Sequence, residues 1–233
     1  MHALILIIFI VAAGVLWFGP PIALKLAQRA RLARHCGGRG VIALTYDDGP
    51  GDQLTRDLLQ LLAEHQARVS FFFLGKRVGQ HPELARQIAQ SGHEIGSHSE
   101  SHKHAWKCVP GVDVADLWRG ARRTADLEGP RRLIRPPYGK LTTGGLAVAL
   151  ACRGRFAWWT IDSGDTWKRL PSVDSVVDAV ARAGGGVVLL HDFQRSGVEA
   201  ASRHEFVLET TRRLLDLART NGWRVVTVGE LIS

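Results

Sequence analysis

Two acidic residues and two histidines in this chain have the types and spacing of a metal site. Asp47 and Asp48 are adjacent carboxylates at the end of an apolar run, and His98 and His102 are four residues apart. Histidines at that spacing lie on one face of a helical turn, close enough to bind one ion. With one carboxylate they form a two-histidine, one-carboxylate set that leaves positions open for water and substrate. The second carboxylate of the pair is then free to act as a base.

Two further segments carry groups for orienting a charge and for proton transfer. The run from Arg135 to Gly139 contains two prolines and a glycine, which fix a turn able to present a backbone N–H. The guanidinium of Arg135 can make a bidentate contact with a carboxylate. His191 follows another apolar run, and a histidine at such a position titrates near neutral pH and can serve as a general acid.

A fifth polar segment contains two carboxylates, Asp162 and Asp165, and the aromatic residue Trp167. Each segment alone has an ordinary interpretation, as a helix cap, a packed tryptophan or a surface histidine pair. Five of them, however, stand at five strand ends. In a parallel α/β fold the carboxyl ends of the strands share one edge, where sites are built. The five segments together therefore predict one catalytic centre.

The elements that must position these residues are short strands alternating with helices. The apolar runs are continuous rather than alternating, as in a parallel sheet buried on both faces. Leucines at helical spacing, such as Leu54, Leu58 and Leu61, predict helices between them. This alternation predicts an α/β fold, either a small barrel or a doubly wound sheet. The predicted strands cover residues 41–46, 69–74, 94–97, 132–135, 156–161, 187–190 and 224–228.

The first part of the chain has a different composition. Between Ala3 and Leu24 no residue is charged, and a helix of this length can cross a hydrocarbon core of roughly 30 Å. A cleaved signal peptide fits less well, because only two residues precede the run and no small-x-small cleavage site follows. We therefore predict a single-pass membrane anchor with a basic juxtamembrane segment over residues 1–36, and one catalytic domain over residues 37–233.

The charge distribution agrees with an anchor. Lys and Arg number 30 against 22 for Asp and Glu, a net charge of +8, and residues 1–34 contain four basic residues and no acidic one. Nucleic-acid binding is not expected, because it would need a basic stripe with aromatic platforms. All four basic residues follow the apolar run, so the positive-inside rule places that side in the cytoplasm. The three cysteines are isolated, which argues against a disulfide framework and a cysteine zinc site.

The polar segments, in this order and spacing, resemble the polysaccharide deacetylases of the NodB-homology type, carbohydrate esterase family four. The motifs are TYDDG, HSxxH, RPPYG, DSGDTW and LLH, and the resemblance extends over about residues 41–232. It implies a distorted (β/α) barrel of about seven strands and a divalent metal, with Zn²⁺ first and other transition ions as alternatives. It also implies hydrolysis of an N-acetyl or related acyl group on an amino sugar.

The resemblance assigns roles position by position. It implies that Asp48, His98 and His102 bind the metal and that Asp47 is the general base. His191 would protonate the leaving amine.

Four other positions would support these groups. By the same resemblance, Arg135 would orient the base. Asp165 would pair with His191 and raise its pKa, with Asp162 able to exchange roles with it. The backbone N–H of Tyr138 would stabilise the oxyanion of the tetrahedral intermediate.

Two apolar residues, Trp167 and Leu189, would form the wall of the acyl pocket. One departure from the pattern is visible in DSGDTW, where Thr166 separates the aspartate from the tryptophan that is adjacent to it in many members. This extra residue affects the expected placement of Trp167 more than it affects the expected chemistry.

Three functions remain open at this point. The leading hypothesis is a membrane-tethered sugar N-deacetylase that acts on an envelope polysaccharide or a lipid-linked glycan. The same fold also serves amidohydrolases of small ureide or amide metabolites, but a soluble metabolite gives no reason for an anchor. A non-catalytic glycan-binding scaffold would be expected to have lost motif residues, and none is lost. No obligate protein partner is evident. The positive-inside rule favours a cytoplasmic domain, whereas the family resemblance favours an extracytoplasmic one.

Overall fold

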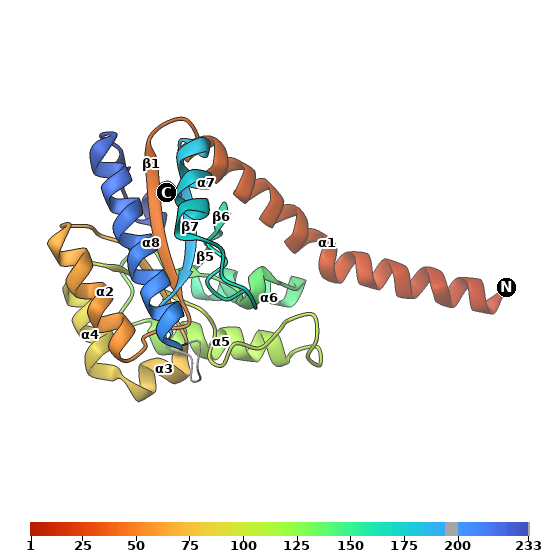
Figure 1. Ribbon diagram of the computed structural model, residues 1–233. Coiled ribbons are helices and arrows are strands. Elements are labelled where there is room, and N and C mark those ends of the chain that lie inside the picture. The colour runs from red at the N-terminus through yellow and green to blue at the C-terminus, as the bar shows by residue number, and fades with distance from the viewer. Residues whose placement is uncertain (194–199, 233) are drawn as a thin grey trace.

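A curled parallel β-sheet surrounded by helices forms the body of the protein, and one long N-terminal helix extends away from it (Figure 1). The computed structural model describes residues 1–193 and 200–232. Its strands are β1 (Val41–Asp47), β2 (Ser70–Phe73), β3 (Glu94–Ser97), β4 (Leu133–Ile134), β5 (Arg155–Phe156), β6 (Ile161–Asp162), β7 (Gly185–His191) and β8 (Arg224–Val225).

The helices lie between and around the strands. They are α1 (His2–Cys36), α2 (Gln53–Glu64), α3 (Gly75–Gln80), α4 (Pro82–Gln90), α5 (Val112–Thr124), α6 (Thr143–Cys152), α7 (Val173–Ala183), α8 (Ala200–Thr220) and α9 (Val228–Leu231). A short 3-10 turn covers Pro137–Gly139. The segments with leucines at helical spacing thus form helices, as predicted.

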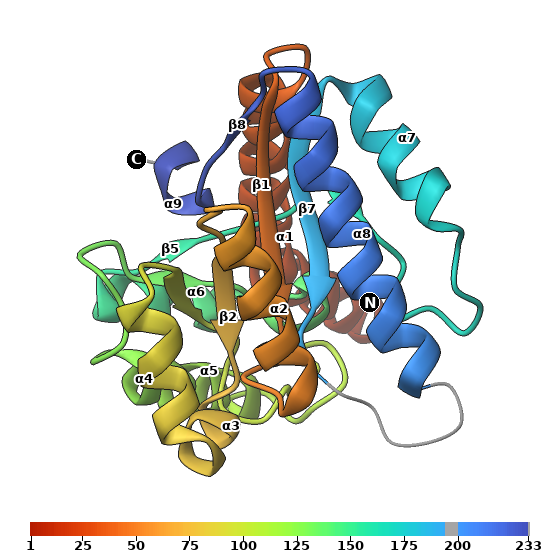
Figure 2. The same ribbon diagram turned by 60° about the vertical axis from the view of Figure 1, so that its left-hand side comes forward.

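Strands β1 and β7 form the centre of the sheet (Figure 2). They pair in parallel over their whole length, from Val41 opposite Gly185 to Asp47 opposite His191. The order across the sheet is β5-β4-β3-β2-β1-β7-β6, with β8 paired to the start of β1. The sheet is parallel throughout the pairs described, and it confirms the predicted distorted (β/α) barrel.

One predicted strand is wrong. Residues 156–161 are not a single strand, because β5 pairs with β4 at one edge of the sheet and β6 pairs with β7 at the other. The chain between them crosses the open side of the barrel. The amide of Ala157 still donates to the carbonyl of Ile134, and the amide of Thr160 donates to that of Val187. An apolar run alone does not distinguish a strand from a buried crossing of this kind.

The two faces of β1 belong to different cores. Ile42, Leu44 and Tyr46 pack with α2 and α8 on one face. Val41 and Ala43 point to the opposite face, toward α1, α5 and α6. Because side chains alternate along a strand, Asp47 shares this second face with Val41 and Ala43. The strand therefore directs its last carboxylate into the interior of the curled sheet.

Helix α1 divides into two parts on either side of the prolines inside it, Pro20 and Pro21. The first part is apolar and exposed, and it extends away from the body of the protein (Figure 1). The second part packs on the domain, and Leu32 and Cys36 are fully buried in the second core. Among the described residues, α1 is the one helix long and apolar enough to cross a membrane. The boundary between an anchor over residues 1–36 and a domain over residues 37–233 stays a prediction. The second part of α1 lies before that boundary and still packs on the domain.

Candidate active site

The strand ends gather most of the predicted site residues around one cavity. Asp47 ends β1, His191 ends β7, and His98 directly follows β3. The cavity has a volume of about 580 Å³ and opens at the carboxyl edge of the sheet. Its lining consists of Asp47, Asp48, His98, His102, Tyr138, Trp159, Asp162, Thr166, Leu189, His191 and Phe193.

Asp48, His98 and His102 form a cluster with the composition of a metal site. Their ligand atoms all lie within 4.8 Å of one another. Asp48 Oδ1 is 3.6 Å from His98 Nε2 and 3.3 Å from His102 Nε2. This oxygen is buried and has no hydrogen-bond partner among the described residues. A buried carboxylate oxygen without a donor is costly, and a cation between the three side chains would satisfy it. The residues present fit a divalent ion.

The protonation of His98 suits a ligand. Its Nδ1 lies 2.7 Å from the carbonyl oxygen of Arg135. Because a carbonyl can only accept, Nδ1 carries the proton, and the lone pair of Nε2 points toward Asp48. Burial lowers the pKa of His98 to about 3, so the ring is neutral at physiological pH. A neutral imidazole is the form that binds metals.

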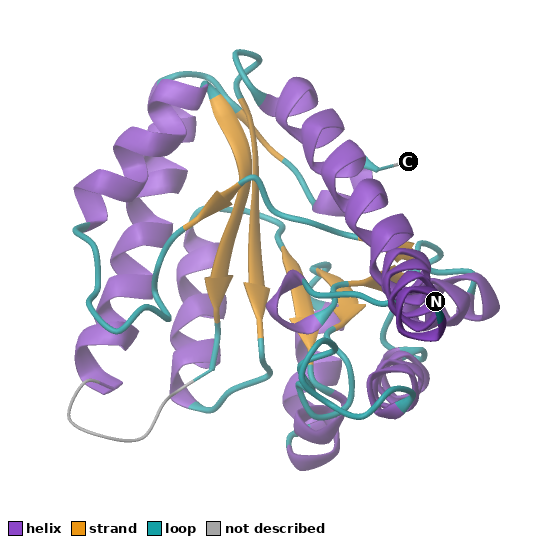
Figure 3. Cartoon of the chain, turned by 90° about the vertical axis from the view of Figure 1, so that its right-hand side faces the viewer, coloured by secondary structure: helices purple, strands orange, loops and turns teal. Residues whose placement is uncertain are grey.

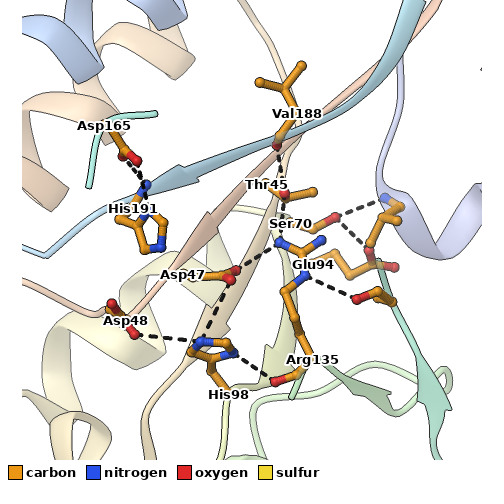
Figure 4. A network of polar contacts seen from close by, with 12 residues as sticks. Thr45, Asp47, Asp48, Ser70, Glu94, His98, Arg135, Asp165, Val188 and His191 are labelled. Atoms are coloured by element: carbon orange, nitrogen blue, oxygen red, sulfur yellow. Dashed lines mark hydrogen bonds and ion pairs between the residues drawn. The ribbon is translucent and has the colours of Figure 1, made fainter. Parts of the chain in front are cut away.

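Of the two adjacent aspartates, Asp47 is the one whose carboxylate contacts a basic side chain. It is 2% exposed, and its Oδ1 accepts a 2.8 Å hydrogen bond from Arg135 Nη1 (Figure 4). Burial raises the pKa of Asp47, and the Arg135 guanidinium opposes that rise. Its Oδ2 is 3.7 Å from His98 Nε2. One oxygen is therefore fixed by arginine, and the other faces the metal cluster.

Arg135 is itself held in place by several contacts. It is fully buried, and it donates to the Thr45 hydroxyl and to the carbonyl of Ala157. The Thr45 hydroxyl in turn donates to the carbonyl of Val188. The guanidinium also lies 4.0 Å from the centre of the Phe72 ring. This network connects Asp47 of β1 with Val188 of β7 and with Phe72 of β2, and it therefore fixes the position of the carboxylate relative to both strands.

His191 also lines the cavity, and it pairs with Asp165 (Figure 4). Its Nδ1 lies 2.9 Å from Asp165 Oδ1, and its backbone N–H donates to Oδ2 at 2.7 Å. Burial alone would lower the pKa of His191, but the Asp165 carboxylate outweighs it and raises this pKa to about 10. The Asp162 carboxylate instead accepts the N–H of Gly164 within its own turn.

Comparison with known proteins identifies the family of the chain. The family model described as polysaccharide deacetylase matches residues 34–155. A chitooligosaccharide deacetylase of Bradyrhizobium sp. is 34% identical over 73% of this chain and 81% of its own length. The chain belongs to the polysaccharide deacetylase family. A peptidoglycan-N-acetylglucosamine deacetylase of Bacillus cereus is 29% identical over 82% of this chain and 88% of its own length.

Solved structures give the same result for the fold. The Bc1960 peptidoglycan N-acetylglucosamine deacetylase has a TM-score of 0.71 and 26% identity, with 84% of this chain and 90% of that chain covered. Membership of the deacetylase family confirms the predicted enzyme class. A family 4 carbohydrate esterase pseudoenzyme from Bacillus anthracis also has this fold, with a TM-score of 0.69 and 22% identity over 84% of this chain and 66% of that chain. Fold alone therefore does not establish turnover, and the site residues decide it.

Tyr138 stands where the deacetylase family resemblance predicts an oxyanion donor. Its backbone is left-handed, with φ of 56°, in the turn fixed by the neighbouring prolines. Its side chain is 54% exposed, and its ring centre lies 4.5 Å from that of His102. Tyr138 and Leu189 both line the cavity, as the pattern predicts.

The structure does not bring Trp167 to this cavity. The chain turns at Gly164, whose φ is 72°, and it is Thr166 that lines the cavity. The Trp167 side chain is 54% exposed. Trp159 lies in the wall instead, on the segment that crosses the open side of the barrel.

Sequence reasoning missed Trp159 and Phe193 as lining residues. Phe193 follows the LLH motif by two residues, and that proximity was a usable signal. Trp159 offered no such signal, because residues 156–161 were predicted as one strand.

Proposed function

We propose that this chain is a metal-dependent hydrolase that removes an N-acetyl or related acyl group from an amino sugar of an envelope polysaccharide or a lipid-linked glycan. The observation that carries the proposal is the Asp48, His98 and His102 cluster, with its unsatisfied buried carboxylate oxygen. Asp47, which pairs with Arg135, and His191, which pairs with Asp165, line the same cavity as this cluster. The relatives named for chitooligosaccharide and peptidoglycan substrates support the choice of substrate class.

Asp48, His98 and His102 would hold the ion, with Zn²⁺ first and other transition ions as alternatives. Bound there, a divalent ion supplies Lewis acidity toward the acyl carbonyl and a lower pKa for water. Asp47 is the proposed acceptor of the proton of the attacking water. Burial raises its pKa and makes it a stronger base, while Arg135, which donates to its Oδ1, favours the ionised form. Its free oxygen faces the side of the cavity where His98 lies.

His191 donates the second proton. With a pKa of about 10 it is protonated at neutral pH, as a general acid for the leaving amine must be. Asp165 fixes the ring and stabilises its charged form. The backbone N–H of Tyr138 is the proposed donor to the oxyanion, and Leu189 lines the acyl pocket.

The apolar first part of α1 is the proposed membrane anchor, and residues 37–233 the proposed catalytic domain. By length and composition, an apolar helix near the N-terminus fits a signal sequence as well as a membrane span. The Pro20-Pro21 pair and the packing of the second part of α1 on the domain support an anchor continuous with the folded domain.

The test is release of acetate or formate by the purified full chain in detergent. Substrates are N-acetylated chitooligosaccharides and peptidoglycan fragments, with allantoin as the ureide comparison. We expect acyl release from the amino sugars alone, loss of activity with a chelator and recovery with Zn²⁺ or another transition ion. In His102→Ala, bound metal measured by mass spectrometry should fall well below one ion per chain. Undiminished activity after complete metal removal would exclude the proposed chemistry.

A further inference from the structure

The loop between β3 and α5, together with the first residue of α5, presents an apolar patch that is exposed among the residues the structure describes. It consists of Trp106, Val109 and Val112, which are 40%, 72% and 38% exposed. We call these three residues the interfacial patch. The Trp106 ring contacts Phe18 of α1, with 5.6 Å between ring centres. The patch is therefore continuous with the apolar surface of α1 at the point where that helix meets the domain.

The length of α1 sets how close this patch lies to a membrane. Thr143 at the start of α6 donates to the carbonyl oxygens of Leu16 and Trp17. Both contacts fall inside the uncharged run from Ala3 to Leu24, whose 22 residues extend about 33 Å at about 1.5 Å per residue. A hydrocarbon core is about 30 Å thick. If α1 spans a membrane, as the proposed function holds, the domain surface around Leu16 and Phe18 must enter the membrane interface.

The charges around the patch suit an anionic lipid surface. Lys103 and Lys107 are exposed on the same loop, and Lys140 Nζ lies 4.1 Å from the centre of the Trp106 ring. No acidic residue occurs between residues 101 and 112. Tryptophan with flanking lysines is typical of residues at the level of lipid headgroups, and each lysine near an anionic surface favours binding.

The same loop also reaches the cavity. His102 lines the cavity four residues before Trp106, and the Tyr138 ring packs against both His102 and His104. Lys25, just after the apolar part of α1, donates from Nζ to the carbonyl of Gly139 at 2.7 Å. Figure 3 shows α1 projecting toward the viewer from this side of the domain. The edge of the cavity thus lies beside the patch.

We infer that the interfacial patch binds the headgroup region of an anionic bilayer, and that the cavity opens along that surface toward a sugar held at the membrane. This inference rests on the proposed function, because it needs α1 to span. Its partner is the lipid surface itself, and its consequence is a preference for membrane-held over free glycan.

Fluorescence quenching by lipids tests the position of the patch. In a Cys108→Ser background, Val109→Cys carries an environment-sensitive label, since Cys36 and Cys152 are buried. The full chain is placed in vesicles of phosphatidylcholine and phosphatidylglycerol with quenchers on the headgroup or the acyl chain. Asn221→Cys, exposed beyond the end of α8, is the matched control, and Val11→Cys on α1 reports insertion.

We expect headgroup quenchers to act at position 109 and not at 221, with acyl-chain quenchers acting at 11. Quenching at 11 without quenching at 109 would overturn the inference while leaving the anchor intact. No quenching at either position would mean that the anchor itself is wrong. Disulfide-linked dimers of the unlabelled Val109→Cys chain, formed in the vesicles with an added thiol oxidant, would assign the patch to a second copy of the chain.

Kinetics test the consequence. Val109→Asp should lower kcat/KM for an N-acetylglucosamine oligomer attached to vesicle lipid about fivefold, the factor that one charge contributes near an anionic surface. Activity on the same oligomer free in solution should not change. Asn221→Asp adds the same charge far from the patch and should change neither value. Equal losses on both substrates would point to damage of the fold and would contradict the inference.

Discussion

At the scale of single residues, the two carboxylates at the end of β1 have different surroundings. Asp47 is fixed by Arg135 on one oxygen, whereas Asp48 has a buried oxygen without a donor. Backbone geometry separates them, because Asp48 adopts a left-handed φ of 73° that turns it out of the strand. Adjacent positions thus point toward different partners, which is the arrangement required for one base and one ligand.

The base assignment predicts a large loss of turnover with the metal retained. In Asp47→Asn the amide cannot take up a proton, and kcat should fall by about 10²–10⁴. Metal content should stay near that of the unchanged chain, because Asp48, His98 and His102 are intact. Asp174→Asn, at a mostly exposed carboxylate on α7, is the control and should keep its activity. Substantial residual turnover in Asp47→Asn would remove this residue from the role of base.

The pairing of Asp165 with His191 predicts a shift in the pH profile. His191 acts in its protonated form, and the raised pKa of about 10 keeps it protonated up to that pH. In Asp165→Asn the imidazolium loses its carboxylate partner, so its pKa falls and the alkaline decline of kcat/KM should begin at lower pH. Asp162→Asn should leave that limb in place, because Asp162 accepts only from Gly164 among the described contacts. An unmoved alkaline limb in Asp165→Asn would mean that another group is the acid.

At the scale of elements, the apolar runs of the sequence predicted the strands, and the motifs at their ends predicted which side chains meet at the site. Asp47, His98 and His191 follow predicted strands, and a parallel sheet brings such ends together. The position of Trp159 was not predictable in the same way. It depends on β5 and β6 lying at opposite edges of the sheet, and sheet order is decided by long-range pairing that no local pattern contains.

Helix α1 is the element whose role changes most between sequence and structure. Composition indicates an anchor, but its second part also supports the site. Gln28 accepts from the Trp158 indole at 2.5 Å, and Arg29 Nε donates to the carbonyl of Trp159 at 2.9 Å. These contacts hold the crossing segment that carries the Trp159 wall of the cavity. Charge and hydropathy could not reveal them, because they depend on where that segment lies in the fold.

We therefore expect α1 to contribute to the stability of the catalytic domain. Leu32→Ala removes a fully buried side chain and should lower the free energy of unfolding by about 2–5 kcal/mol. Leu26→Ala, at a side chain that is 61% exposed on the same helix, should change it by less than about 0.5 kcal/mol. Thermal unfolding of the full chain in detergent, followed by tryptophan fluorescence, measures both. Equal melting temperatures for the two variants would show that α1 is only a tether.

At the scale of the whole molecule, if α1 is the proposed anchor, the side of the membrane on which the domain lies determines which substrates are accessible. The basic residues after the apolar run favour the cytoplasm. Two of them, Lys25 and Arg29, are bound to backbone carbonyls of the domain, while Arg31 and Arg34 remain exposed. Because these charges lie on the part of α1 that packs into the domain core, domain and charge must stay on the same side.

We accordingly expect a cytoplasmic reporter fused after Ser233 to be active and an alkaline phosphatase fusion at the same position to be inactive. Arg31→Glu with Arg34→Glu should weaken this preference, because the two exposed charges are then reversed without touching Lys25 or Arg29. A cytoplasmic domain would act on a precursor sugar before export, and the interfacial patch would bind the inner leaflet, where anionic lipids are enriched. Active alkaline phosphatase would contradict this orientation. It would place the cavity beside the outer surface and make assembled envelope polysaccharide the substrate to test first.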